Sequence, residues 1–66
     1  MIAGVAISKA TYAMDKPFSY RVPENLFLSP GQRVTVPFGN GNVRTEGIVL
    51  SLSPGENGEL KEVEGV

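Results

Sequence analysis

The chain has 66 residues and a formal net charge of −1, and it contains neither cysteine nor histidine. A chain of this length forms one domain at most and buries only about 60% of the surface that its unfolded form exposes. The missing residue types exclude disulfides, thiolate nucleophiles, cysteine-based zinc sites and the imidazole base, which argues against an enzyme and favours a reducing, cytoplasmic setting.

Charge is distributed unevenly along the chain. Residues 1–45 carry five basic and two acidic side chains, a net charge of +3, whereas residues 46–66 carry one basic and five acidic side chains, a net charge of −4. This distribution permits a small basic surface but not a long groove that follows a phosphate backbone. Any contact with nucleic acid is therefore expected to be small and local.

The first expected element is a strand over residues 2–8, in which Val5 and Ile7 share one face. This apolar opening lacks a basic flank and is far shorter than the roughly 20 residues of a membrane-spanning helix, so no targeting or transmembrane segment is expected. Residues 9–17 are interpreted as irregular. A second strand is expected over residues 18–22, because Pro23 stops it.

Turn signals separate the next elements. Pro30-Gly31 predicts a turn, since proline presets φ at the second turn position and glycine accepts a positive φ at the third. A third strand is expected over residues 33–38, and Pro37 predicts that its end lies at a sheet edge or a bulge. The sequence GNGN at 39–42 predicts a hairpin turn.

The longest expected strand covers residues 43–52, and Gly47 inside it predicts a bend or a bulge. After a turn over SPGENG, residues 59–66 are interpreted as a last strand with Leu60 facing inward. Helical periodicity is absent from every stretch of 11 or more residues. The sequence therefore predicts an all-β fold: a small, partly open barrel or sandwich of four to five short, strongly bent strands, in one domain over residues 1–66.

The stretch KPFSYRVP at 16–23 places Phe18 and Tyr20 at alternate positions between two prolines. The pattern leaves two interpretations open. Either both rings close the core, or they form a platform on which a nucleobase stacks while Lys16 and Arg21 meet a phosphate. The glycine of VPFG at 36–39 also has two interpretations. It permits a turn, or it lets the backbone approach a ligand closely. Phosphate loops of the form GxxxxGK[ST] are absent from the sequence.

The chain resembles the N-terminal segment of the primosomal protein N′ (PriA) family of bacterial replication-restart helicases in four motifs: KPFSYRVPENL, PGQRVTVPFG, GIVLSL and ELKEV. They occur in this order and at the family's spacings, from about Ile2 to Val63. The resemblance implies a small β-rich module, the N-terminal part of a longer helicase. Such a module binds the 3′ end of a DNA strand, for example the nascent leading strand at a stalled or branched fork.

The resemblance also implies the residues of a shallow pocket for the 3′-terminal nucleotide: Phe18, Ser19, Tyr20, Gly39 and Lys61. The middle residue of the aromatic triplet is usually aspartate in that family, and its carboxylate accepts two hydrogen bonds, from a base edge and from the terminal 3′-hydroxyl. Ser19 offers one shorter hydroxyl instead. Discrimination in favour of a free 3′-hydroxyl is therefore expected to be weaker here than the family pattern implies.

By the same resemblance, DNA is the partner of this module, no membrane is involved, and the location is cytoplasmic. Other primosome proteins and single-stranded DNA-binding protein are implied as partners of the full-length chain. No cofactor or metal is expected within these 66 residues, since ATP, magnesium and zinc belong to the rest of the ATP-dependent helicase. The alternative, from a different functional class, is a small β-barrel adaptor that contacts protein through a hydrophobic patch of Phe18, Tyr20 and Phe38.

Overall fold

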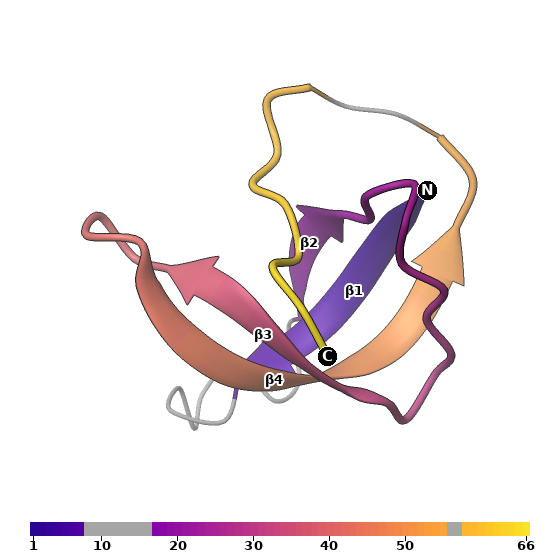
Figure 1. The fold of residues 1–66 in the computed structure, drawn as a ribbon, viewed down its shortest axis with the longest axis horizontal. Coiled ribbons are helices and arrows are strands. Elements are labelled where there is room, and N and C mark those ends of the chain that lie inside the picture. Colours follow the sequence, from indigo (N-terminus) through magenta and orange to yellow (C-terminus); the bar gives the residue numbers. More distant parts are fainter. Residues whose placement is uncertain (8–16, 56–57) are drawn as a thin grey trace.

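A computed structural model describes residues 1–7, 17–55 and 58–66 of the chain. Four strands, β1 (Ile2–Ile7), β2 (Phe18–Arg21), β3 (Arg33–Phe38) and β4 (Val43–Ser53), form one antiparallel sheet that curls into a half-barrel (Figure 1). The strand order across the sheet is β2-β1-β4-β3. The all-β prediction is confirmed, and the four predicted strands agree with the structure within one residue at each described end. Within the described ranges, no helix is long and apolar enough to cross a membrane.

The hydrophobic core lies inside the curl of the sheet. It consists of eight buried hydrophobic residues, to which every strand contributes: Ala3, Val5, Ile7, Tyr20, Val34, Val36, Val49 and Val63. Valine dominates this set because β-branched side chains pack well on a pleated surface. The prediction that Val5 and Ile7 share one face is confirmed, since every second residue of β1 is buried. Residues 9–17 were predicted to be irregular. All of them except Pro17 lie outside the described residues.

The long strand β4 pairs with both β1 and β3 and is strongly bent along its length (Figure 1). The predicted bulge exists, but it lies at Leu50, which β1 skips in its pairing with β4, and not at Gly47. The bulge reverses the alternation, so that Val49 and Leu52 both contact the core. Gly47 instead allows two strands to approach closely, because a Cβ there would lie 2.9 Å from the Ala6 carbonyl oxygen.

Both turns predicted on either side of β3 are confirmed. Gly31 has φ +92°, and the Gln32 N–H donates to the Ser29 carbonyl at 3.0 Å, which is the expected turn with proline second and glycine third. Residues 39–42 form the hairpin turn from β3 to β4, with positive φ at the first and last of them. Local sequence signals therefore decide where these strands begin and end.

Residues 60–66, here called the tail, take the place of the predicted last strand and lie across the opening of the half-barrel (Figure 1). The tail forms isolated bridges, parallel to Arg21 of β2 and antiparallel to Thr35 of β3. Val63 is its buried residue, whereas Leu60 is half-buried, so the prediction that Leu60 is the inward-facing residue is wrong. Because β2 and β3 are the two edge strands of the sheet, the tail connects the two edges that the curl leaves unpaired.

Candidate nucleic-acid interface

The start of β2, the end of β3 and the tail meet in one region, residues 18–20, 37–39 and 61, which we call the seam. Two hydrogen bonds cross it. The Tyr20 hydroxyl donates to the Pro37 carbonyl at 2.8 Å, and the Lys61 Nζ donates to the Gly39 carbonyl at 2.7 Å. The seam therefore joins residues that are 17 and 22 positions apart in the sequence.

The direction of the β3 backbone explains why these carbonyls face the seam. The Thr35 N–H donates to Gly65 of the tail at 2.8 Å, and the Thr35 carbonyl accepts from Glu64 at 2.9 Å. Since backbone directions repeat every two residues along a strand, the Pro37 carbonyl faces the same edge. There the missing N–H of proline removes no hydrogen bond from the sheet. The prediction that Pro37 lies at a sheet edge is confirmed.

Tyr20 holds the seam together from the inside. It is 4% exposed, and its ring belongs to the core cluster. Burial raises the pKa of the Tyr20 hydroxyl, so the group stays protonated at neutral pH and remains a donor to Pro37. A ring enclosed to this degree offers no face to a nucleobase. The stacking platform expected from the pair is therefore wrong for Tyr20, and the core interpretation describes its ring.

Phe18 and Phe38 form the aromatic part of the seam that reaches the surface. Both are half-buried, and their rings pack edge to face with centroids 5.2 Å apart and an interplanar angle of 78°. This arrangement fixes the position of each ring before any ligand arrives. Of the hydrophobic patch of Phe18, Tyr20 and Phe38 that the adaptor alternative requires, the burial of Tyr20 removes one ring and leaves the two half-buried phenylalanines.

Gly39 and Lys61 are exposed members of the seam that a hydrogen bond joins to each other. Gly39 has φ +76°, a conformation that favours glycine, and a Cβ added there would meet no atom of the described residues within 4 Å. The space in front of its peptide is therefore open. The Lys61 ammonium has three N–H donors and uses one of them on Gly39, which leaves donors for an acceptor from outside the chain.

Ser19, the remaining predicted site residue among those that the structure describes, has no hydrogen bond to Gly39 or Lys61. Ser19 is exposed, and by strand alternation its side chain points away from the side of Phe18 and Tyr20. Lys16, which was expected to meet a phosphate, lies outside the described residues.

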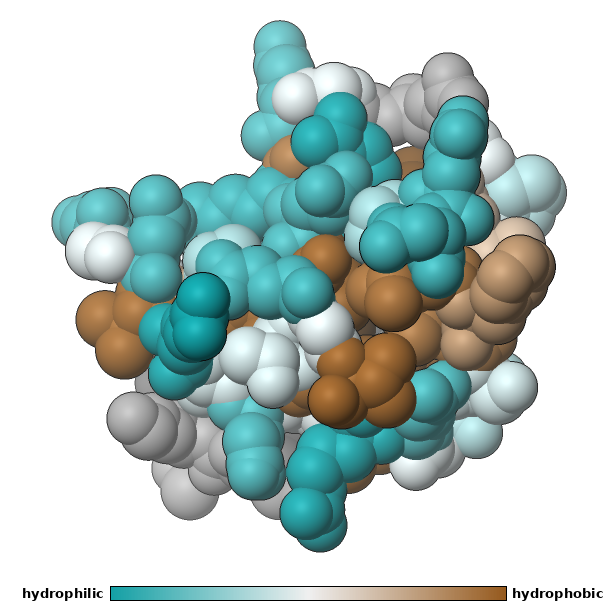
Figure 2. All heavy atoms as spheres, in the orientation of Figure 1, coloured by the Kyte–Doolittle hydropathy of each residue, from teal (hydrophilic) through white to brown (hydrophobic). Residues whose placement is uncertain are grey.

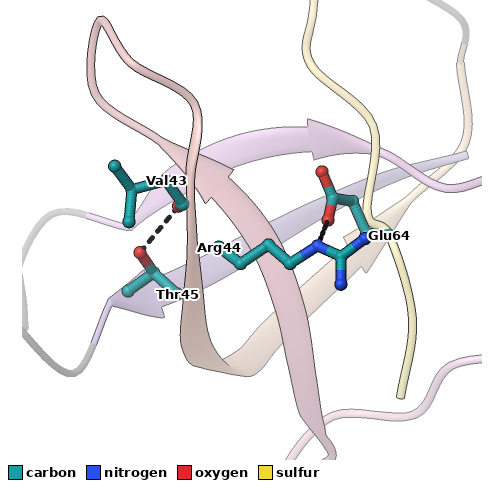
Figure 3. Close-up of polar contacts among 4 residues, drawn as sticks. All are labelled: Val43, Arg44, Thr45 and Glu64. Carbon is teal, nitrogen blue, oxygen red and sulfur yellow. Dashed lines mark hydrogen bonds and ion pairs between the residues drawn. The ribbon is translucent and has the colours of Figure 1, made fainter.

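The tail neutralises part of the basic excess of residues 1–45. Arg44 on β4 reaches the tail, where its Nε lies 3.1 Å from Glu64 Oε1 (Figure 3). Arg21, the second residue expected to meet a phosphate, has its Nε 3.4 Å from Glu62 Oε2. The sequence analysis missed both ion pairs, although the opposite charges of the two parts of the chain were a signal for them.

Surface hollows of appreciable size lie away from the seam. One of about 450 Å³ lies between the tail and the loop that follows β2, where Leu26, Arg44 and Val63 are among its lining residues. A second, of about 340 Å³, is lined by Met1 and residues of the same loop, including Phe27, which is 90% exposed. Figure 2 shows hydrophobic residues gathered on this side of the molecule. Neither hollow contains a residue of the seam, so neither is the pocket that the resemblance implies.

Comparison with known proteins gives one match. The family described as the 3′ DNA-binding domain (3′BD) of PriA matches residues 4–66. This range contains the whole seam and the whole tail. The curated proteins and the solved structures contain no match to the chain.

Proposed function

The chain belongs to the family of PriA 3′ DNA-binding domains, so its partner is DNA, and we propose that it binds the 3′ end of a DNA strand at a stalled or branched fork. Bound to the nascent leading strand, it orients a replication-restart helicase on that fork. The observation that carries the proposal is the seam, where the Lys61 ammonium, the open Gly39 peptide and the Phe18–Phe38 ring pair form one small surface.

In this proposal the 66 residues are one module of a longer, cytoplasmic, ATP-dependent helicase. ATP, magnesium and zinc are held by the rest of that protein. Other primosome proteins and single-stranded DNA-binding protein contact the full-length chain. The module itself contributes recognition of a strand end.

The chemistry of the seam suits one terminal nucleotide better than a long strand. A base or sugar that packs on an aromatic ring contributes about 1–3 kcal/mol whatever the base, so recognition does not depend on sequence. Lys61 supplies the single exposed ammonium of the seam, within hydrogen-bonding distance of Gly39. Each phosphate neutralised on a single strand lowers log K by about 0.7 per unit of log salt concentration. Binding through one cation should therefore depend only weakly on salt.

Ser19 has a smaller part in this proposal than Lys61. Its exposed hydroxyl is next to Phe18 in the sequence but lies on the other side of β2. In this proposal it contacts the terminal sugar where the end of the DNA strand passes over the edge of the sheet. Replacement by aspartate restores a carboxylate that accepts two hydrogen bonds. We expect Ser19→Asp to increase the preference for a 3′-hydroxyl over a 3′-phosphate end.

The proposal is tested by fluorescence anisotropy with 5′-labelled single strands that end in a 3′-hydroxyl or a 3′-phosphate. We expect tighter binding to the 3′-hydroxyl end and a loss of about tenfold on Lys61→Ala, because a charge-assisted hydrogen bond is removed. Arg33→Ala is the matched control, since Arg33 is an exposed cation at the opposite end of β3. Equal binding to both ends and to a circular strand, or equal losses in the two variants, would overturn the proposal.

A further inference from the structure

We propose that the tail is a detachable closing element that positions Lys61, and that docking of the tail and binding of a 3′ end stabilise each other. The coupling rests on the proposed function. The docking does not, because it can be measured without DNA.

Docking of the tail relies on backbone groups at the two sheet edges. Arg21 of β2 donates its N–H to the tail at 2.8 Å and accepts through its carbonyl at 2.9 Å, and Thr35 of β3 does the same at 2.8 and 2.9 Å. All strand-to-strand pairing within the sheet is independent of these bonds. Release of the tail would therefore expose two edges while the four-stranded sheet stays paired.

Apart from Val63, the side chains of the tail add little to its attachment. Val63 is fully buried, but the charged residues of the tail are exposed, and their ion pairs with Arg21 and Arg44 are of the solvent-exposed kind that contributes little. Val63 also borders the hollow of about 450 Å³. Arg21 Nε itself is buried and makes no hydrogen bond among the described residues, since its contact with Glu62 Oε2 at 3.4 Å is an ion pair only, and release of the tail would return the Nε to water. These features are typical of a segment that opens before the rest of a fold.

The same segment carries Lys61 to the seam. The Lys61 carbonyl accepts the Arg21 N–H, which fixes the Lys61 backbone beside β2, and its side chain then reaches Gly39 on the far side of the opening. An undocked tail removes the ammonium from the seam, while the Gly39 carbonyl keeps the bond from the Asn42 N–H within its own turn. A DNA end that contacts Lys61 binds the docked state better. By linkage it must stabilise docking by the same factor that docking improves its binding.

Val63→Ala tests whether the tail positions Lys61. It removes the buried anchor of the tail and leaves the Lys61 side chain itself unchanged. We expect the tail to be undocked in most molecules of this variant, so that amide hydrogen exchange at Arg21 and Thr35 approaches the rate of unprotected amides, with no change at the amides that join β1 to β4. Binding of a strand with a 3′-hydroxyl should fall about as far as in Lys61→Ala. Val66→Ala is the matched control, because Val66 lies in the same segment but is 70% exposed.

A reversible disulfide provides the rescue. Thr35 and Gly65 form an antiparallel bridge, for which Cα atoms about 5.5 Å apart suit a disulfide. A Cβ at Gly65 would meet no atom of the described residues within 4 Å, so a cysteine has room there, and the two Cβ atoms lie at the long end of the range for a disulfide. The chain has no cysteine that would compete. With Thr35→Cys and Gly65→Cys added to Val63→Ala, oxidation should restore slow exchange at Arg21 and tight binding, and reduction should reverse both. The same disulfide in the otherwise native chain gives the comparison if Val63→Ala does not fold.

The outcomes separate this inference from the proposed function. Restored exchange protection together with restored 3′-end binding supports the coupling. In Val63→Ala, exchange at Arg21 as fast as in an unprotected amide, together with native affinity, overturns the coupling and leaves the proposed function standing. Unchanged exchange in that variant overturns the detachable tail. A native chain that binds no 3′ end overturns the proposed function and the coupling, whereas the docking of the tail is still decided by exchange.

Discussion

Tyr20→Phe is the substitution that isolates one bond of the seam. The variant keeps the buried ring and removes only the hydroxyl that donates to Pro37 at 2.8 Å. Pro37 is buried, and its carbonyl faces the β3 edge, where β4 provides no donor. The substitution therefore leaves a buried acceptor without its partner.

The magnitude follows from that geometry. A buried acceptor that loses its hydrogen bond destabilises a fold by about 1–3 kcal/mol, and retention of the ring avoids a cavity term. We expect the free energy of unfolding to fall by about 1.5 kcal/mol. In a domain of 60–100 residues, 1 kcal/mol shifts Tm by about 4–8 °C, so the expected loss is about 10 °C.

Thermal unfolding followed by circular dichroism measures this loss. Ser53→Ala is the control, since it removes an exposed hydroxyl from β4 and should leave Tm almost unchanged. A Tyr20→Phe variant that melts within about 2 °C of the native chain would refute the reasoning, because the Pro37 carbonyl would then have to find an equivalent donor elsewhere.

Three further predictions follow from single positions. Gly47→Ala should destabilise the chain by about 2 kcal/mol or more in urea unfolding, because the new methyl group meets the Ala6 backbone. The control is Gly58→Ala, which should be nearly neutral because its methyl group meets no atom of the described residues within 4 Å. Equal effects of the two substitutions would contradict the close approach of the strands at Gly47. Gly39→Ala should cost about 1–2 kcal/mol in the same assay through its φ of +76° alone, since no atom obstructs the new side chain, and a neutral result would show that the turn relaxes. The pKa of Tyr20 is raised by burial, so its contribution to stability is complete below the unfolded value near 10 and is lost as pH rises through the folded pKa. Phenolate absorbance in a Tyr12→Phe background should therefore rise at higher pH for the folded chain than for the chain in urea, and coincident titrations would exclude the burial effect.

The sequence by itself determined the all-β class, the four strands and the two turns on either side of β3. These features depend on neighbours in the chain: alternation of buried residues, proline as a stop, and glycine where φ is positive. The residues of the seam were named from the family resemblance, and the structure brings Gly39 and Lys61 into contact although no local rule relates them.

Only the tertiary structure decided what each of these residues does. Alternation shows that Phe18 and Tyr20 share a side of β2, but the curl of the sheet determines that one ring is enclosed and the other stays half-exposed. Alternation equally failed to choose Val63 over Leu60, because the backbone bonds to two distant strands set which residue of the tail turns inward. The physical reason is that closure depends on the summed twist and bulge of the whole sheet, which no short stretch of sequence contains.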